Sequence, residues 1–199
     1  MLCPCSGLDG PASLLRKQSQ TGTVLDVLRL TQKLPLWQSD AALAGVRDAK
    51  ELTGLPKQEQ EPWRQLWADV AQLVKQTKAR YIETKYQGAL TAKQTEVVHE
   101  VKMLASKTYV LDMESPKFDT YLRLEDAKGK VLDENDDISA DDQNSRLIFS
   151  PKEAGVYRVI ATSFQQQGSG AYTLKIREFA GPLGKKNDSP NGPESGRTK

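Results

Sequence analysis

The sequence predicts a mainly β protein: an antiparallel β-sandwich of jelly-roll type, preceded by a short α-helical segment. Two observations support this fold class. Hydrophobic residues in the first 80 positions recur at helical spacing. From about residue 81 the hydrophobic period changes to two, and about eight short alternating segments follow, separated by turn residues. Short strands at this spacing are typical of two packed antiparallel sheets rather than of a parallel sheet.

The clearest helical pattern lies between residues 61 and 80. Its apolar side chains form one stripe, because they fall at i, i+3, i+4, i+7, i+10 and i+11. They are Trp63, Leu66, Trp67, Val70, Leu73 and Val74. We expect this stripe to pack against a neighbouring element, and we expect Pro62 to occupy the first turn, where proline is tolerated. Weaker patterns predict helices over residues 21–33 and 40–48.

The expected strands span residues 81–90, 95–102, 107–113, 118–124, 130–132, 145–149, 156–164 and 171–176. In the last of them Tyr172, Leu174 and Ile176 alternate with polar residues, which predicts one buried and one solvated face. The chain is therefore expected to consist of a helical segment over residues 1–80 with a frayed N-terminus, a β-sandwich over 81–179 and a disordered tail over 180–199. The tail is rich in Gly, Pro, Ser and charged residues.

The composition argues against several classes of function. The net charge is only +2 and acidic residues gather in the second half, so we expect no nucleic-acid partner. No stretch approaches the ~20 apolar residues that a membrane-spanning helix needs. The opening sequence lacks the apolar run of a secretory signal, and the compartment stays open. Cys3 and Cys5 form a lone C-x-C pair, which supplies too few ligands for a structural zinc site.

Catalytic motifs are also missing from the sequence. His99 is the only histidine, and although His99-Glu100 begins like a zinc-protease motif, Met103 stands where the second histidine is needed. No G-x-S-x-G sequence is present to hold a nucleophile. We therefore expect no enzymatic activity and no required cofactor, and we interpret His99 as a partly exposed strand residue.

A dense group of oxygen ligands lies between residues 133 and 144. Its members are Asp133, Glu134, Asn135, Asp136, Asp137, Asp141, Asp142 and Asn144. Calcium prefers such hard oxygen ligands. The first positions fit the EF-hand pattern, but Ile138 occupies its glycine position and Asn144 replaces its closing glutamate, so this is not an EF-hand.

Two interpretations of this acidic segment remain open. One is a looser calcium site formed by Asp133, Asn135, Asp136 and Asp137, joined by Asp119 from the neighbouring strand. The other is a solvated acidic turn with Asx-type hydrogen bonds and an ion pair to Arg146.

Several blocks of residues 81–179 resemble the bacterial pre-peptidase C-terminal domain. In chain order they read HEVKMLASKTYVLDMES, FDTYLRLEDAKGKVLDENDD, NSRLIF, AGVYRVIATSF and GAYTLKIREF. Members of that family are β-sandwich modules, usually attached to secreted proteases and other large bacterial proteins. The resemblance implies a non-catalytic accessory module that binds protein or polysaccharide through its sandwich surface, and some members bind calcium.

The collagen-binding relatives of that family use exposed aromatic residues. The aromatic residues of this chain that could serve in the same way are Tyr121, Tyr157, Phe164 and Tyr172. Their positions in the expected strands favour core packing instead.

The helical segment resembles a different family. WQSDAALAGVRDAKELTGLPKQEQEPWRQLWADVAQLVKQTK is similar to the region that follows tetratricopeptide-type repeats in large bacterial serine/threonine kinases. The alternative function is therefore that of a structural or regulatory terminal fragment of such a kinase. The kinase glycine-rich loop and the HRD and DFG motifs are absent.

Overall fold

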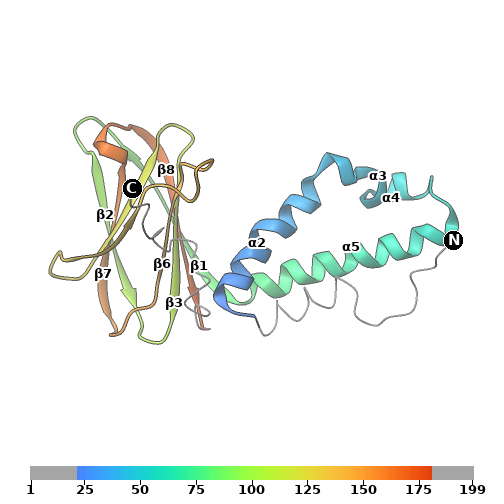
Figure 1. Ribbon diagram of the computed structural model, residues 1–199, viewed down its shortest axis with the longest axis horizontal. Coiled ribbons are helices and arrows are strands. Elements are labelled where there is room, and N and C mark those ends of the chain that lie inside the picture. The colour runs from blue at the N-terminus through green and yellow to red at the C-terminus, as the bar shows by residue number, and fades with distance from the viewer. Residues whose placement is uncertain (1–21, 181–199) are drawn as a thin grey trace, which may run out of the picture. The chain divides into compact units, whose positions relative to one another are not determined.

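The computed structural model describes residues 22–180 (Figure 1). These residues form two units that divide between Arg80 and Tyr81. The expectations for Cys3, for Cys5 and for the tail from residue 181 fall outside the described residues. Within residues 22–180, no helix is long and apolar enough to cross a membrane.

The first unit is helical. Its elements are α2 (Val24–Ser39), the 3₁₀ helix η1 (Ala41–Leu43), α3 (Ala44–Arg47), α4 (Ala49–Leu52) and α5 (Lys57–Lys78). The two long helices pack together through Leu30 and Leu34 of α2 and Val70 and Leu73 of α5. The Trp67 ring adds a polar contact, since its Nε1 donates to the Val46 carbonyl at 2.7 Å. The tryptophan therefore joins α5 to the short helices instead of facing a ligand.

Two details of the helices differ from the sequence prediction. Helix α2 continues through Pro35 to Ser39, beyond the expected end at residue 33. Helix α5 begins at Lys57, so Pro62 lies inside the helix and the expected first-turn position is wrong. Pro62 has no N–H to donate to the Gln58 carbonyl, and both residues are exposed, so that water can bond to this carbonyl instead.

The second unit is a sandwich of eight strands. They are β1 (Tyr81–Leu90), β2 (Glu96–Met103), β3 (Thr108–Glu114), β4 (Thr120–Glu125), β5 (Val131–Asn135), β6 (Ser145–Phe149), β7 (Gly155–Ser163) and β8 (Gly170–Phe179), with a short 3₁₀ helix η2 (Phe164–Gln166) before the last. One sheet has the order β1-β8-β3-β6 and the other β2-β7-β4-β5. All pairs are antiparallel.

This strand order is that of a jelly roll. The first strand pairs with the last, the second with the seventh, the third with the sixth and the fourth with the fifth. The chain is thus one long antiparallel hairpin that rolls up into two sheets, which confirms the predicted fold class. Alternate residues of the strands fill the space between the sheets. The buried core there consists of Leu90, Met103, Tyr109, Leu111, Met113, Leu122, Leu124, Leu147, Val159, Ala161, Tyr172, Leu174 and Ile176.

Because successive strands run in opposite directions, the connections between them lie alternately at the two ends of the sandwich. Four of them lie at one end of the sandwich, which we call the loop end: residues 91–95, 115–119, 136–144 and 164–169. The chain enters and leaves the sandwich at the opposite end, where Tyr81 pairs with Phe179. The loop end is therefore built only from connections that the two sheets hold in place.

Candidate functional site

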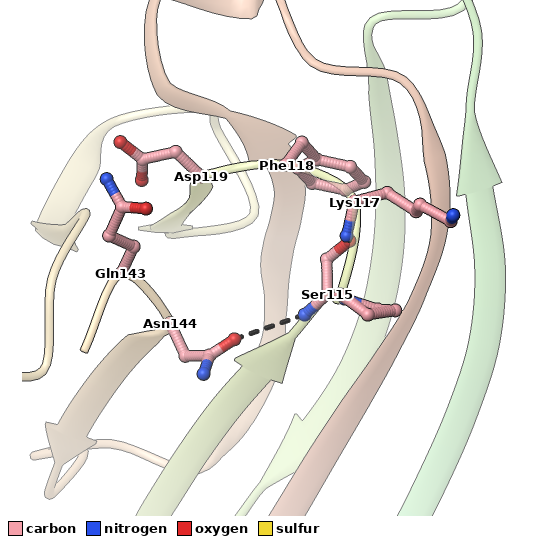
Figure 2. Close-up of a pocket in the computed structure, with 7 residues that line it drawn as sticks. Ser115, Lys117, Phe118, Asp119, Gln143 and Asn144 are labelled. Carbon is pink, nitrogen blue, oxygen red and sulfur yellow. Dashed lines mark hydrogen bonds between the residues drawn. The ribbon is translucent and has the colours of Figure 1, made fainter.

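A pocket of about 430 Å³ opens at the loop end (Figure 2). Two connections line it, the one between β3 and β4 and the last residues of the one between β5 and β6. The lining residues are Ser115, Pro116, Lys117, Phe118, Asp119, Gln143 and Asn144. Its volume falls within the range of small-molecule and side-chain binding sites in proteins.

Hydrogen bonds fix the two walls of the pocket to each other. The Asn144 Oδ1 accepts from the Ser115 backbone N–H at 3.1 Å, the bond drawn in Figure 2. The Ser115 hydroxyl donates to the Ala171 carbonyl at 2.9 Å and accepts from the Lys117 N–H at 3.1 Å. Below them, the Thr120 N–H donates to the Gln143 carbonyl at 3.1 Å. The walls are therefore fixed by backbone and short polar side chains.

Two glycines allow the β7–β8 connection to approach this wall. A Cβ at Gly168 would lie 2.5 Å from the Phe118 Cβ, and a Cβ at Gly170 would lie 2.8 Å from the Lys117 Cβ. Gly170 also has a φ of +137°, a backbone angle that residues with a side chain rarely adopt. The Phe164 N–H then donates to the Asp119 carbonyl at 3.0 Å. Close backbone packing thus positions Phe118 and Asp119.

The polar groups of the pocket differ in how far their hydrogen-bonding capacity is used. Asn144 uses both ends of its carboxamide, because its Nδ2 also donates to the Asp142 Oδ1 at 2.7 Å. The Asp119 Oδ1 is buried and has no hydrogen-bond partner within residues 22–180. The Gln143 side chain is exposed, and no hydrogen bond from it is found in that part of the chain. Figure 2 shows Asp119 and Gln143 on the same side of the pocket.

Burial and neighbouring charges act together on Asp119. Desolvation raises the pKa of its carboxyl group, and the carboxylates of Asp137 and Asp136 raise that pKa further. Both effects disfavour the ionised form, and a cation placed beside Asp119 would reverse them.

The structure brings together only part of the predicted calcium ligands. Asp119, Asp136 and Asp137 lie near enough for their charges to interact. Asp133 and Asn135 belong to strand β5, so the acidic segment is not a single loop as expected. The Asn135 Oδ1 accepts a hydrogen bond from the Arg146 backbone N–H at 3.0 Å. The Asp133 Oδ1 accepts one from the Glu134 backbone N–H, also at 3.0 Å.

A calcium ion therefore fits the donor set only in part. The unpartnered Asp119 oxygen and the two nearby carboxylates are suitable ligands. Among residues 22–180, however, no three His, Cys, Asp or Glu side chains are grouped so as to hold a metal ion as they stand.

The turn interpretation of the acidic segment is partly correct. The expected Asx-type bonds are present: the Asp142 Oδ1 accepts from the Asn144 N–H at 3.1 Å, and the Asp136 Oδ1 accepts from the Asp137 N–H at 3.0 Å. The guanidinium of Arg146 pairs with the buried Asp112 of β3, its direct neighbour across the sheet, and the Asp142 carboxylate of the acidic segment also acts on it.

His99 contacts aromatic residues of the opposite sheet. It lies on β2, its Nε2 is 2.9 Å from the Tyr172 hydroxyl, and its ring centroid is 4.8 Å from that of Tyr86. Burial lowers the pKa of the imidazole. The contact joins one sheet to the other, because β2 belongs to one and β8 to the other.

The expected core packing of the aromatic residues is correct for two of the four. Tyr172 is in the core and Tyr157 packs against it. Phe164 is 41% exposed at the loop end, and Tyr121 is half-buried on the outer face of its sheet.

Sequence reasoning named Asp119 and Asn144 but missed the rest of the pocket. Residues 115–118 carry a Ser-Pro turn signal and nothing that marks a binding site. Gln143 is more than twenty positions away in the sequence, so only the fold places it beside Asp119.

Comparisons with known proteins show a likeness in fold. No protein-family model matches the sequence, and no curated protein matches it. Among solved structures, the chain is similar to the pre-peptidase C-terminal domain of collagenase from Bacillus anthracis, with a TM-score of 0.39 and 11% identity over 48% of this chain and 89% of that one. It is also similar to Aeromonas hydrophila PliG, a periplasmic inhibitor of g-type lysozyme, with a TM-score of 0.39 and 10% identity over 51% of this chain and 89% of that one.

At these scores the likeness concerns the β-sandwich alone. The residues of the pocket, and not the neighbours, carry the functional argument.

Proposed function

We propose that this protein is a non-catalytic binding module that holds a protein or polysaccharide ligand in the pocket at its loop end. The observation that carries the proposal is the unused hydrogen-bonding capacity of Asp119 and Gln143. Both line a pocket of suitable volume, and within the described residues both have unused hydrogen-bonding capacity. A buried oxygen without a partner is costly, so binding sites are a common place to find one.

The scaffold supports this role. The pocket walls are fixed by hydrogen bonds and by the close approach of Gly168 and Gly170, so little ordering is needed when a ligand binds. The chain enters and leaves the sandwich at the end opposite the pocket. His99, the residue type most often used in acid–base catalysis, is occupied in joining the sheets.

Calcium binding is a second candidate role of this region, and it excludes a ligand cation on Asp119 because both would use the same carboxylate. Asp119, Asp136 and Asp137 would hold the ion, because the charges of Asp136 and Asp137 act on the Asp119 carboxyl group. Asp133 and Asn135 would not, because they belong to strand β5. The two positive charges of the ion would offset most of the repulsion among the three carboxylates.

Binding to arrays of immobilised glycans and peptides tests the main proposal. The Gln143→Ala variant removes an exposed pocket side chain and leaves the described hydrogen bonds intact. Lys152→Ala changes an equally exposed side chain at the opposite end of the sandwich and serves as the control. We expect the wild type and Lys152→Ala to bind the same compounds, with binding lost or strongly reduced in Gln143→Ala. Absence of binding, or equal binding by all three proteins, would contradict the proposal.

A further inference from the structure

We infer that the pocket receives a positively charged side chain, arginine or lysine, presented by a partner protein, with the Asp119 carboxylate as its main contact. The inference rests on the proposed function and names the ligand class for the same pocket. Three observations carry it: the pocket has polar groups without hydrogen-bond partners, the charges around the pocket are mostly negative, and basic side chains of the adjoining sheet are paired with other carboxylates.

The unused groups are mainly hydrogen-bond acceptors. An ionised carboxylate only accepts, and neither side-chain oxygen of Asp119 accepts a hydrogen bond within residues 22–180; Oδ1 is buried, so Oδ2 is the oxygen open to the pocket. The Gln143 carboxamide adds a further acceptor oxygen on the same side of the pocket. A guanidinium group carries five N–H donors and no acceptor, and an ammonium group carries three, so either cation complements this pair.

The charges around the pocket are mostly negative. The carboxylates of Asp136 and Asp137 act on Asp119, and that of Asp142 lies in the same connection. One cation, Lys117, lines the pocket, and Figure 2 shows its side chain extending away from Asp119. Such an arrangement attracts cations and raises their local concentration.

Two basic side chains of the sheet β1-β8-β3-β6 are paired with other carboxylates. Lys175 pairs with Glu114 at 2.6 Å, and Arg146 pairs with Asp112. Neither pair places its cation on Asp119, whose carboxylate remains available to a group from outside.

The same commitments disfavour a saccharide. Sugar hydroxyls both donate and accept hydrogen bonds, and they need donors as well as acceptors from the protein. Asn144 uses one N–H of its Nδ2 on Asp142 and its Oδ1 on Ser115, so part of its hydrogen-bonding capacity is already taken up within the chain. A neutral ligand would also leave the charge on Asp119 uncompensated beside Asp136 and Asp137.

The test compares two small probes by nuclear magnetic resonance on the full chain, in the presence of chelator. N-acetyl-arginine amide carries the cation, and N-acetyl-citrulline amide has the same length with a neutral urea group. We expect N-acetyl-arginine amide to shift the backbone amide signals of residues 115–119 and 143–144 in a saturable way, with a Kd at least tenfold lower than that of the citrulline compound.

Two variants assign the effect to Asp119. Asp119→Asn keeps the shape of the side chain and removes its charge, and we expect it to weaken binding of the arginine compound at least tenfold. Asp141→Asn removes one charge from an exposed side chain that does not line the pocket, and we expect a change of less than twofold. Equal binding of the arginine and citrulline compounds, or equal loss in both variants, would overturn the inference.

A third probe separates this inference from the proposed function. If an N-acetylglucosamine hexasaccharide shifts the pocket signals and the arginine compound does not, the ligand class is wrong and the binding site stands. If neither probe shifts these signals, the inference is overturned and the pocket loses its support as a binding site.

Discussion

The Tyr172 hydroxyl lies 2.9 Å from the His99 Nε2 and joins the two sheets of the sandwich across the core. Burial raises the pKa of Tyr172 and lowers that of His99. Both shifts favour the neutral forms, in which the tyrosine hydroxyl can donate to an unprotonated ring nitrogen. The contact therefore depends on a histidine that stays neutral in the folded protein.

This contact predicts a pH dependence of stability. Because the pKa of His99 is lower in the folded state, the unfolded chain binds a proton at a pH where the folded chain does not. The free energy of unfolding should therefore fall as the pH drops below the ordinary histidine pKa of about 6.5. Chemical unfolding between pH 5 and 8 measures this, with His99→Gln as the reference. We expect the two profiles to diverge below about pH 6.5, and parallel profiles would show that His99 does not titrate differently on unfolding.

Gly88 supports the same contact from the neighbouring strand. It pairs directly with Tyr172, and a Cβ there would lie 2.5 Å from the tyrosine hydroxyl oxygen. We expect Gly88→Ala to displace the ring and to lower the free energy of unfolding by about 1–3 kcal/mol. Gly155→Ala, whose Cβ would meet only an ordinary contact at 3.9 Å, is the matched strand control. Equal stability of the two variants in denaturant titrations would contradict this account of Gly88.

The sequence was informative about the strands because each carries a local signal. Alternation places the start of β8 within one residue and identifies its inner face, since Tyr172, Leu174 and Ile176 all face the core, but the strand continues three residues beyond the predicted end. Strand β5 is longer than predicted because its last residues are Asp133, Glu134 and Asn135, whose charges conceal the period of two. The strand forms there because its backbone pairs with β4 whatever the side chains are.

Contacts between distant parts of the chain could not be predicted from the sequence. Arg146 has acidic neighbours in the sequence, but its partner Asp112 is 34 positions away and becomes its neighbour only when β3 pairs with β6. The pocket has the same origin. Asp119 and Gln143 come from two connections, and only the jelly-roll strand order brings these together.

Asp112 provides a strong test of the sheet interior. It is 1% exposed and pairs with the guanidinium groups of Arg146 and Arg177. We expect Asp112→Asn to cost about 3–5 kcal/mol, because two buried cations lose their counter-charge. Glu114 lies on the same strand as Asp112 and forms an exposed ion pair with Lys175 of β8. Glu114→Gln removes this pair and should cost less than about 1 kcal/mol. Urea titrations of both variants measure the difference, and similar losses would contradict the role assigned to Asp112.

Calcium binding predicts a difference in thermal stability. An ion held by Asp119, Asp136 and Asp137 binds only the folded chain, so millimolar calcium should raise the melting temperature by several degrees over chelator. The shift should disappear in the Asp136→Ala, Asp137→Ala double variant and persist in Asp141→Ala. A melting temperature that does not respond to calcium in the wild type would remove the proposed site.

The most direct test of the binding site is the pKa of Asp119 itself, measured from the carboxyl carbon signal as the pH is varied. In the free protein we predict a value above the ordinary aspartate pKa of about 3.9, because the carboxyl is buried beside Asp136 and Asp137. On addition of N-acetyl-arginine amide the value should fall, because a bound cation favours the carboxylate. An ordinary pKa that does not move when the arginine compound is added would contradict the account.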